Sequence, residues 1–404
     1  MTTLSLTIHG GSVPSASAAS LIPSQVQIAG ERIAAITPGA GERAAAQLDA
    51  SGCHVLPGLI DVHVHGALGH DTMDADPAAL GAMARFFAAH GVTGFLATTM
   101  TAGRAATRDA VAAAAAYAHT PAAGARLLGV HLEGPFISPR FPGAQLADAI
   151  RPPDVAEFNA LAETGPVRMI TLAPEQPGAD ALIAAARQRG VVVVTGHTAA
   201  TYDECEAAVR QGVSQATHTY NAMTGLHHRQ PGTLGSVLTN DAVYAQLIAD
   251  NIHVHPAAMQ VLARCKGVER TVLITDAMRA AGLPPGRYDL GGQAVTVQNR
   301  ECRLADGTLA GSVLTLEVGL ANFLAATGMS LAQGWPAASR TPAASLGLPD
   351  LGQMAVGGLA DLVILDMALH VVATVVAGRV VYLRDGERLR GDGRDDHPWR
   401  AGGE

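Results

Sequence analysis

Two histidines stand two residues apart at the end of an apolar run, in the stretch LIDVHVHG of residues 59–66. Side chains two residues apart on a strand point to the same face, so His63 and His65 project side by side, with Asp61 on that face as well. Two imidazoles placed in this way can chelate a divalent metal ion. A pair of hydrogen-bonded core histidines would give the same pattern, and this stretch by itself leaves both interpretations open.

Four further apolar runs end in side chains that can bind a metal ion or transfer a proton. They end in the stretches HLEG, TGHT, ATHTYNAM and ITDAM, which contribute Glu133, His197, His218 and Asp276. Imidazole and carboxylate groups are the usual ligands of catalytic divalent metals, and a carboxylate beside such a site can act as a general base. Side chains of these types at the ends of five predicted strands favour one metal site over separate structural roles.

These side chains can meet only in a fold that gathers the ends of many strands. Apolar, β-rich runs alternate from residue 55 onward with alanine-rich helical stretches, such as residues 76–90, 178–190 and 201–212. Continuous apolar runs are typical of parallel strands buried on both faces and joined by crossover helices. We therefore predict an α/β fold, a (β/α)8 TIM-type barrel with its active site at the carboxyl ends of the strands. The predicted strands lie within residues 55–66, 91–100, 125–135, 167–175, 190–198, 213–223, 244–256 and 270–278.

The two ends of the chain carry short strand and turn patterns, neither long enough for a core of its own. We expect them to combine into a small β-sandwich domain built from both chain ends. The predicted boundaries are residues 1–56 for its first part, 57–345 for the barrel and 346–404 for its second part. The last part includes a glycine-rich tail of mixed charge, from residue 384, that we expect to be frayed.

Composition excludes several classes of function. The chain has 404 residues, of which 48% are hydrophobic and 15% charged, a balance that favours a large buried core. The formal net charge of −8 and the absence of basic runs argue against nucleic-acid binding. The four cysteines have no metal-type or disulfide spacing, and neither a signal peptide nor a membrane-spanning run is evident. We therefore expect a cytoplasmic protein.

The histidines, the aspartate and the barrel pattern resemble the amidohydrolase superfamily. Its hallmark is a His-x-His pair on the first barrel strand, histidines on the fifth and sixth strands and an aspartate on the eighth. Many members bridge two metal ions with a carboxylated lysine on the fourth strand. The only lysine of this chain, Lys266, lies at the end of a predicted helix, so the resemblance implies that Glu133 is the bridging ligand instead.

The stretch HLEGPF around Glu133 narrows the resemblance to the N-acetylglucosamine-6-phosphate deacetylases. Further similar stretches follow along the chain: HLEGPFISPR, PGAQ, TLAPE, GHT, THTYNAM, HHRQPG, LIADNIHVHP, LITDAMRAAG, DGTLAGS and GGLADLVILD. The likeness covers most of the chain. It implies metal-dependent hydrolysis of N-acetyl-D-glucosamine 6-phosphate to D-glucosamine 6-phosphate and acetate, in amino-sugar catabolism and cell-wall recycling.

The resemblance also implies roles for individual residues. Asp276 would be the catalytic acid–base group. One or two divalent metal ions per subunit would be bound, zinc or iron by expectation, with manganese and cobalt also compatible with such ligands. The implied metal ligands are His63, His65, Glu133, His197 and His218. The implied substrate contacts are Ala144, Gln145, Asn221, Ala222, His228, Arg229, Asp250, His253, Leu309, Ala310 and Gly311.

Arg229 is the clearest handle for a phosphate group, because a guanidinium can bind phosphate through two parallel hydrogen bonds. In the family its equivalent reaches the active site of the neighbouring subunit, which implies a homodimer. Gln145 stands where one branch of the family has a histidine that contacts the substrate and another branch has glutamine. His131 and His255 are expected to be structural.

Two alternatives remain at this stage. The chain could deacetylate a related sugar such as N-acetylgalactosamine 6-phosphate, or act as another amidohydrolase, since no residue of the sequence identifies which sugar epimer is bound. It could also be a non-catalytic barrel, although such proteins usually lose ligands and this chain retains them. The expected partners are an amino-sugar phosphate and a second copy of the chain, with no nucleic acid and no membrane.

Overall fold

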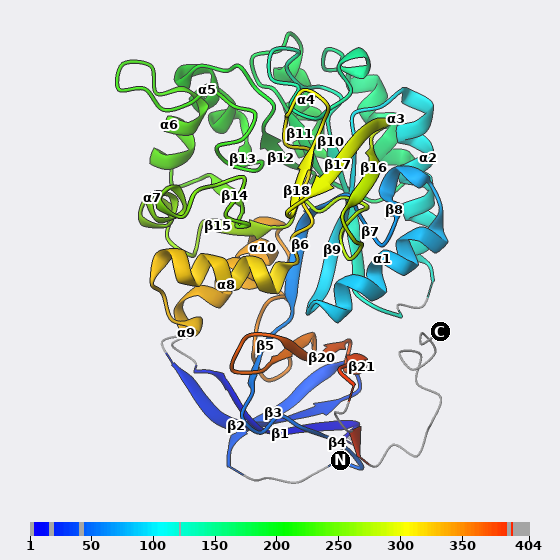
Figure 1. Cartoon of the computed structure of the whole chain (residues 1–404), viewed down its shortest axis with the longest axis vertical. Helices are drawn as coiled ribbons and strands as arrows, with labels where there is room; N and C mark the ends of the chain where they lie inside the picture. The colour runs from blue at the N-terminus through cyan, green and yellow to red at the C-terminus, as the bar shows by residue number, and fades with distance from the viewer. Residues whose placement is uncertain (1–3, 16–19, 40–43, 121–122, 386–388, 391–404) are drawn as a thin grey trace.

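A barrel domain lies above a smaller β domain, and the chain passes between them where β5 (His54–Pro57) leads into β6 (Leu59–Val64) (Figure 1). The computed structural model describes residues 4–15, 20–39, 44–120, 123–385 and 389–390. Most of the predicted C-terminal tail lies outside the described residues. None of the helices within the described ranges is long and apolar enough to cross a membrane.

Eight parallel strands form the barrel sheet, in the order β15-β14-β13-β12-β11-β10-β9-β6. This confirms the predicted fold class and each of the eight predicted strands. The observed strands are shorter than the apolar runs from which they were predicted. The first predicted strand is divided at Gly58, and its beginning belongs to the small domain. The strands are β6 Leu59–Val64, β9 Val92–Thr99, β10 Arg126–Glu133, β11 Val167–Leu172, β12 Val192–Thr195, β13 Val213–Ala216, β14 Tyr244–Ile248 and β15 Thr271–Ile274.

Contacts just beyond β15 join the two ends of the barrel sheet. The main-chain N–H of Asp276 donates to His63 O at 2.9 Å, and the N–H of His65 donates to Ala277 O at 2.9 Å. The carboxylate of Asp61 on β6 accepts from the Thr275 hydroxyl at 2.5 Å. The seam therefore holds the His63–His65 pair and Asp276 next to each other.

Helices cover the outside of the barrel. The predictions for residues 76–90, 178–190 and 201–212 are confirmed as α1, α4 and α5. Side chains that satisfy the free N–H groups of a first helical turn explain several helix starts: Asp76 caps α1, and Thr201 begins α5 in a capping box with Glu204. The helices are α1 Pro77–Ala89, α2 Arg104–Ala118, α3 Val155–Thr164, α4 Ala179–Gln188, α5 Tyr202–Gln211, α6 Gly232–Thr239, α7 Pro256–Lys266, α8 Leu316–Thr327, α9 Leu331–Gly334 and α10 Arg340–Ser345.

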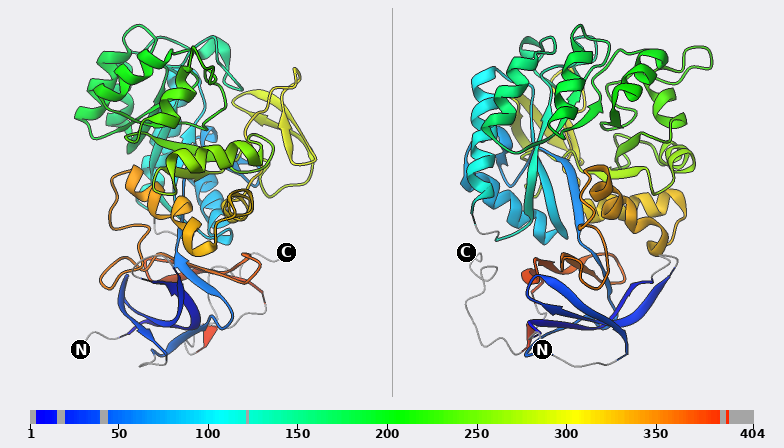
Figure 2. Two further views of the ribbon diagram at one scale, coloured as in Figure 1. Left: turned by 90° about the vertical axis from the view of Figure 1, so that its left-hand side faces the viewer. Right: turned by 180° about the vertical axis from the view of Figure 1, so that it is seen from behind.

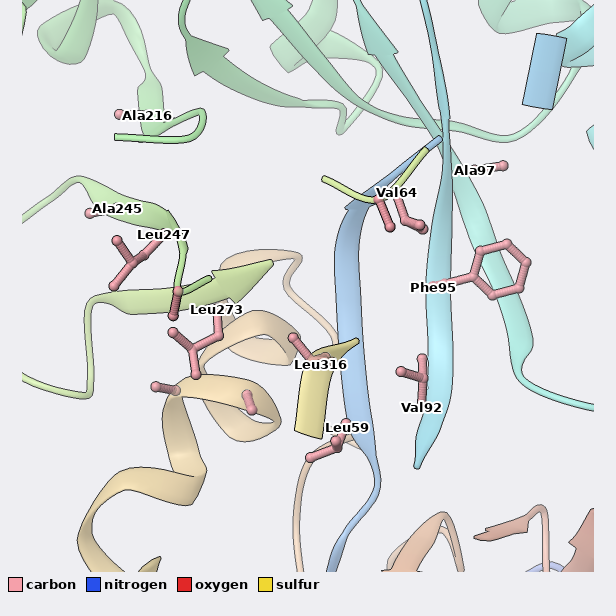
Figure 3. Packing of buried hydrophobic residues seen from close by; sticks show 14 of the residues in the cluster. Leu59, Val64, Val92, Phe95, Ala97, Ala216, Ala245, Leu247, Leu273 and Leu316 are labelled. Atoms are coloured by element: carbon pink, nitrogen blue, oxygen red, sulfur yellow. The ribbon is translucent and has the colours of Figure 1, made fainter. Parts of the chain in front are cut away.

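The core is layered as expected for a barrel. Figure 3 shows apolar side chains such as Leu59, Val92, Phe95, Leu247 and Leu273, which belong to the cluster between the strands and the surrounding helices. A second cluster is formed largely by the alternate side chains of the strands, and its buried members include Ile60, Val62, Leu96, Val194, Ile248, Val272 and Ile274. Strands with apolar side chains on both faces therefore carry the continuous apolar runs seen in the sequence.

Strands from both chain ends form one sheet in the small domain, below the barrel in Figure 1. Along its main path the order is β21-β20-β19-β5-β1-β2-β3, with β4 beside β1 and β22 beside β4. It packs around a core of its own that includes Ile8, Ile28, Leu48, Leu362 and Val375. The strands are β1 Leu6–Pro14, β2 Leu21–Ala29, β3 Arg32–Pro38, β4 Ala46–Asp49, β5 His54–Pro57, β19 Leu362–Leu365, β20 Val371–Val376, β21 Arg379–Leu383 and β22 Leu389–Arg390.

One structural unit was not predicted from the sequence. An antiparallel sheet of β16 (Gly286–Leu290), β17 (Gln293–Gln298) and β18 (Glu301–Arg303) follows β15 and projects beside the barrel (yellow in Figure 2). A Gly291–Gly292 turn with positive φ at both residues joins β16 to β17, and β17 alternates buried and exposed positions. A Gly-Gly pair before an alternating run is a recognised hairpin signal, so the sequence did contain a sign of this unit.

Candidate active site

A cavity of about 510 Å³ opens at the carboxyl ends of the barrel strands. This is the end at which barrel enzymes carry their active sites. Its lining includes four of the five predicted metal ligands and Asp276, while His63 is fully buried beneath it. The other lining residues are Met100, Arg140, Phe141, Pro142, Gly143, Ala144, Gln145, Asn221, Ala222, Ile248, His253, Leu290, Asp306, Thr308, Leu309 and Gly311.

Glu133 at the end of β10 is the centre of the cluster. Its Oε1 lies 3.2 Å from His197 Nε2 and 3.1 Å from His218 Nε2. Its Oε2 lies 3.1 Å from His65 Nε2. One carboxylate therefore faces the histidines after β12 and β13 with one oxygen and the histidine after β6 with the other.

His63, His65 and Asp276 form the other side of the cluster. Asp276 Oδ1 lies 3.2 Å from His65 Nε2 and 3.5 Å from His63 Nε2. His63 Nε2 is also 3.3 Å from Glu133 Oε1, yet it is buried and has no hydrogen-bond partner. An unpartnered ring nitrogen that points at two carboxylates is costly to bury unless something else binds it.

The backbone bends sharply where three of these side chains enter the site. His197, His218 and Asp276 have φ values of 46°, 23° and 51°, in the left-handed region that non-glycine residues rarely adopt. Each such residue costs on the order of 1–3 kcal/mol, and residues of this kind cluster at functional sites. The bends turn the side chains inward directly after their strands.

Two of the predicted ligands are oriented by main-chain carbonyls. His65 Nδ1 lies 3.2 Å from Thr98 O, and His197 Nδ1 lies 3.0 Å from Phe141 O. A carbonyl can only accept, so each Nδ1 carries a hydrogen, and each Nε2 would present its lone pair to a metal ion bound at the centre of the cluster. Histidine ligands of metals are held in this manner in proteins.

The residues therefore fit a divalent metal ion at two positions. His63, His65 and Glu133 form one group, and Glu133, His197 and His218 form the other. Within each group the potential ligand atoms lie within 4.8 Å of one another, and all five residues are buried. These are the only such groups of histidine, cysteine, aspartate and glutamate side chains among the described residues.

The electrostatics of the cluster keep its carboxylates ionised. Burial alone would raise the pKa of Asp276, but the neighbouring His63 and His65 outweigh this effect and lower that pKa to about 2. Burial is likewise outweighed at Glu133 by His63, His197 and His218, which hold its pKa well below the ordinary value. Burial and the nearby His63 lower the pKa of His131 well below the ordinary value, so this ring is neutral.

Gln145 lies within the cluster. Its side-chain N–H donates to Glu133 Oε2 at 2.7 Å, and its Oε1 accepts from the Thr101 N–H at 2.7 Å. The amide therefore holds the Glu133 carboxylate in its orientation. The family resemblance implied that Gln145 contacts the substrate, and nothing in the sequence predicted its contact with Glu133.

The other predicted substrate contacts divide into two groups. Ala144, Asn221, Ala222, His253, Leu309 and Gly311 line the cavity. His228, Arg229, Asp250 and Ala310 do not line it within this chain. Asp250 holds His253 through a 2.7 Å contact with the ring Nδ1, and Ala310 is buried under the β16–β18 sheet.

His228 and Arg229 lie in an exposed turn, where an Arg229 guanidinium nitrogen is 2.7 Å from the His228 ring. Arg140, which was not predicted from the sequence, is the one arginine among the cavity-lining residues of the described chain. Its place in HLEGPFISPR, directly after Glu133 and its loop, was the available signal.

Three residues set aside in the sequence have structural contacts. His131 Nε2 lies 2.7 Å from the Thr171 hydroxyl inside the barrel, and His255 caps the start of α7. Lys266 ends α7 and donates from Nζ to Asn240 O at 2.6 Å. None of the three lines the cavity.

Comparison with known proteins gives the class of this barrel. The family model described as "Amidohydrolase family" matches residues 54–381, which include the whole barrel and the site. The chain belongs to the amidohydrolase family. The class that the fold and the family define is therefore a hydrolase.

Its relatives define a narrower group. The N-acetylglucosamine-6-phosphate deacetylase of Lysinibacillus sphaericus is 41% identical over 337 residues, covering 83% of this chain and 87% of the relative. The N-acetylgalactosamine-6-phosphate deacetylase of Escherichia coli O157:H7 is 40% identical over 362 residues, covering 88% and 94%. Within the amidohydrolases, the chain falls among the N-acetylglucosamine-6-phosphate deacetylases, as its sequence motifs indicated.

A solved structure supports this grouping. A mutant of the N-acetyl-D-glucosamine-6-phosphate deacetylase from Mycobacterium smegmatis, in complex with N-acetyl-D-glucosamine-6-phosphate, aligns with a TM-score of 0.87 at 35% identity. The alignment covers 94% of this chain and 99% of the other. The likeness therefore extends over the barrel and the small domain together.

Proposed function

We propose that this chain hydrolyses the acetamide of N-acetyl-D-glucosamine 6-phosphate to D-glucosamine 6-phosphate and acetate. The observation that carries the proposal is the single Glu133 carboxylate shared by two groups of histidines beside Asp276, at the base of the cavity. Relatives about 40% identical over most of both chains are deacetylases of amino-sugar phosphates.

The five predicted ligands would hold one or two divalent cations. Glu133, His197 and His218 would bind one, and His63 and His65 would complete a second site with Glu133. When bound, such a cation supplies a Lewis acid that polarises a carbonyl and activates water near neutral pH. Imidazole and carboxylate ligands suit zinc and iron, and also manganese and cobalt, so we propose zinc or iron as the native metal.

Asp276 would transfer the proton. It is ionised, it lines the cavity, and the bend at its φ of 51° directs it toward the cluster. Amide hydrolysis needs a base that takes a proton from the attacking water and then an acid that delivers a proton to the departing nitrogen. A single carboxylate at this position can perform both steps in sequence.

The substrate would be oriented by groups around the cavity wall. His253 is held by Asp250, so its Nε2 is directed away from that pair and is free to contact a sugar hydroxyl. Asn221 and the main chain at Ala222, whose φ is 48°, lie on the neighbouring loop, which follows β13. The β16–β18 sheet and the segment after it add Leu290, Thr308 and Leu309 to the wall.

The phosphate requires cationic donors that an acidic chain must supply locally. Arg140 at the cavity lining is one candidate within the chain. We propose Arg229 as the second, contributed from a neighbouring subunit of a homodimer, because it is exposed and lies outside its own cavity. The four cysteines form no disulfide, which suits a reducing compartment, and we propose a cytoplasmic location.

A second candidate substrate is N-acetylgalactosamine 6-phosphate. The Escherichia coli O157:H7 relative named for that substrate is 40% identical, close to the 41% of the Lysinibacillus sphaericus relative. The two sugars differ in the orientation of one hydroxyl. Overall identity therefore does not separate them.

An acetate-release assay over four substrates tests the proposal: both N-acetylhexosamine 6-phosphates and both unphosphorylated sugars. We expect N-acetyl-D-glucosamine 6-phosphate to have the highest kcat/KM, and chelation of metal to abolish the activity until zinc or iron is added back. A preference for the galactosamine epimer would select the second candidate. An active enzyme that ignores the phosphate, or one that keeps full activity after metal is verifiably removed, would contradict the mechanism.

A further inference from the structure

Two buried glutamines interrupt the apolar interior of the barrel. Gln215 on β13 and Gln246 on β14 are both fully buried, among neighbours such as Met169. Barrel interiors are usually filled by branched apolar side chains, and a buried amide is costly unless its groups are hydrogen-bonded. The partners of these two amides therefore indicate what they do.

The two amides form a continuous series of hydrogen bonds from one end of the barrel to the metal cluster. The side-chain N–H of Gln215 donates to Ser345 O at 3.0 Å, and the side-chain N–H of Gln246 donates to Gln215 Oε1 at 3.2 Å. At the other end, Gln246 Oε1 lies 3.1 Å from His63 Nδ1. The hydroxyl of Thr217 also donates to Gln246 Oε1, at 3.1 Å.

The donor and acceptor in each of these hydrogen bonds are determined by the contact with Ser345, at the end far from His63. Ser345 is the last residue of α10, and the carbonyls of a last helical turn have no partner within the helix and can only accept. The amide of Gln215 must therefore turn its NH₂ toward Ser345 and its oxygen toward Gln246. Gln246 must in turn direct its oxygen at His63, so that His63 Nδ1 is the donor.

We propose that Gln215 and Gln246 are positioning residues that keep the hydrogen of His63 on Nδ1 and its Nε2 lone pair directed at the metal cluster. His65 and His197 receive the same orientation from main-chain carbonyls, which no substitution removes. For His63, side chains provide this orientation instead. The inference rests on the proposed function, because it takes His63 as a ligand of a metal that the reaction uses.

Without Gln246 the ring has an alternative. The Thr217 hydroxyl lies 3.0 Å from His63 Nδ1 and could donate to that nitrogen once the amide oxygen is gone. The hydrogen of the ring would then move to Nε2, the atom that faces Glu133 and Asp276. A protonated Nε2 cannot bind a metal ion.

The test measures the ring hydrogen and zinc affinity rather than catalysis. In the zinc-loaded protein, nitrogen-15 NMR should show a slowly exchanging His63 Nδ1–H, assigned by its loss in His63→Gln. Gln246→Met, which keeps the side-chain length, should remove or strongly shift this signal. It should also weaken zinc binding at the His63–His65 group by about 10–100-fold in competition with a chelator.

Three further variants separate positioning from packing. Gln246→Glu retains an oxygen acceptor at His63 and should keep the Nδ1–H signal and most of the zinc affinity. Gln215→Met touches no ligand, yet it should weaken zinc binding, with an effect that is not additive with that of Gln246→Met. Thr271→Val removes a partly buried 2.8 Å hydrogen bond to Gly267 O in the same barrel and is the control, with unchanged zinc affinity expected.

Each outcome has a defined meaning. A Gln246→Met protein that keeps the Nδ1–H signal and full zinc affinity would overturn the proposal, as would a Gln246→Glu protein that loses as much as Gln246→Met. A wild-type protein that binds zinc through His63, with the signal present, but releases no acetate from any of the four sugars would instead contradict the proposed function. The two failures are therefore distinguishable.

Discussion

At the scale of single residues, the site combines side chains whose charges depend on one another. Glu133 and Asp276 stay ionised only because the histidine rings around them outweigh the effect of burial on each pKa. Asp276 contacts the His63–His65 side of the cluster but belongs to neither group of potential metal ligands. Its role in proton transfer can therefore be tested separately from metal binding.

Asp276→Asn is expected to lower kcat by about 10²–10⁴-fold, because an amide cannot take the proton of the attacking water. The shape of the side chain is preserved, so the metal content and thermal unfolding of the variant should match the wild type. Steady-state assays of acetate release, with metal quantified in the same preparation, check this. Near-normal turnover in a metal-replete variant would rule out Asp276 as the base.

At the scale of elements, each potential metal ligand lies at the end of a barrel strand, and the position of the strand in the barrel determines the position of the ligand. β6 delivers His63 and His65 together, whereas β10, β12 and β13 deliver Glu133, His197 and His218. The two groups of potential ligands thus share one residue and are otherwise carried by different strands. A change confined to the end of β6 should affect one group only.

His63→Gln combined with His65→Asn is expected to reduce the metal content from about two ions to one per chain, since the group of Glu133, His197 and His218 remains complete. Partial activity would be compatible with that remaining site. Metal analysis after dialysis measures the stoichiometry, and circular dichroism checks the fold. If the stoichiometry is unchanged, the pair on β6 does not bind metal.

The sequence predicted those elements whose signal is local. The eight barrel strands appear as apolar runs, and the polar residues at the ends of five of these runs form the cluster in the site. The β16–β18 sheet was missed because its strands are short and its apolar side chains alternate, although the Gly291–Gly292 turn announces a hairpin.

The links from Gln145 to Glu133 and from Gln246 to His63 could not be read from sequence. They join residues 12 and 183 positions apart, and only the closed barrel brings the second pair together. A buried glutamine in an apolar strand shows that a partner exists, but spacing along the chain does not identify it. The sequence motifs named the five side chains that the structure brings together and left such supporting contacts open.

At the scale of the whole molecule, the small domain packs against the end of the barrel opposite the site. The Thr374 hydroxyl of β20 donates to Ala88 O at the end of α1, and Arg126 at the start of β10 pairs with Asp361 before β19. Gly58 lies where the chain passes from β5 into β6, and its N–H donates to Asp361 O at 2.9 Å. The small domain therefore supports the barrel at the starts of its strands and not at the cavity.

Gly58→Ala is expected to lower the free energy of unfolding by about 1–3 kcal/mol through overpacking. A Cβ at this position would lie 2.1 Å from the buried Thr93 side chain, so β6 or β9 must shift. Chemical denaturation monitored by circular dichroism measures the effect. Gly81→Ala within α1, where a Cβ would come no closer than 3.5 Å to Tyr117, is the control and should not lower stability, because alanine favours a helix more than glycine does. Equal stability of the two variants would show that the junction accommodates a side chain.

The exposed turn that carries Arg229 has the features of a contact between subunits. Leu226, at the start of this turn, is 58% exposed, and the rings of His227 and His228 contact each other at a tilt of 41°, with centroids 4.3 Å apart. An apolar side chain next to basic groups on a projecting turn suits a contact with another subunit, and Arg229 does not line the cavity of its own chain. The turn is therefore the expected route by which one subunit supplies a phosphate ligand to its partner.

Arg229→Ala should lower kcat/KM on N-acetyl-D-glucosamine 6-phosphate by about 10²–10³-fold and leave the low activity on N-acetyl-D-glucosamine nearly unchanged, because the lost hydrogen bonds go to phosphate. Arg229→Lys should recover only part of the loss, since an ammonium lacks the planar fork. Equal losses on both sugars would exclude Arg229 as the phosphate ligand.

Mixing two inactive variants tests whether Arg229 reaches the active site of the neighbouring subunit. A dimer of one Asp276→Asn chain and one Arg229→Ala chain contains one site with native Asp276 and a native Arg229 from the partner. Random exchange in an equal mixture should therefore restore about a quarter of the wild-type activity, because half of the dimers are mixed and each has one complete site of two. If Arg229 served its own subunit, no mixed dimer would contain a complete site. If subunit exchange is verified by native mass spectrometry and no activity is recovered, Arg229 acts within its own subunit. Its role in phosphate binding would then be decided by the comparison of the phosphorylated and unphosphorylated sugars.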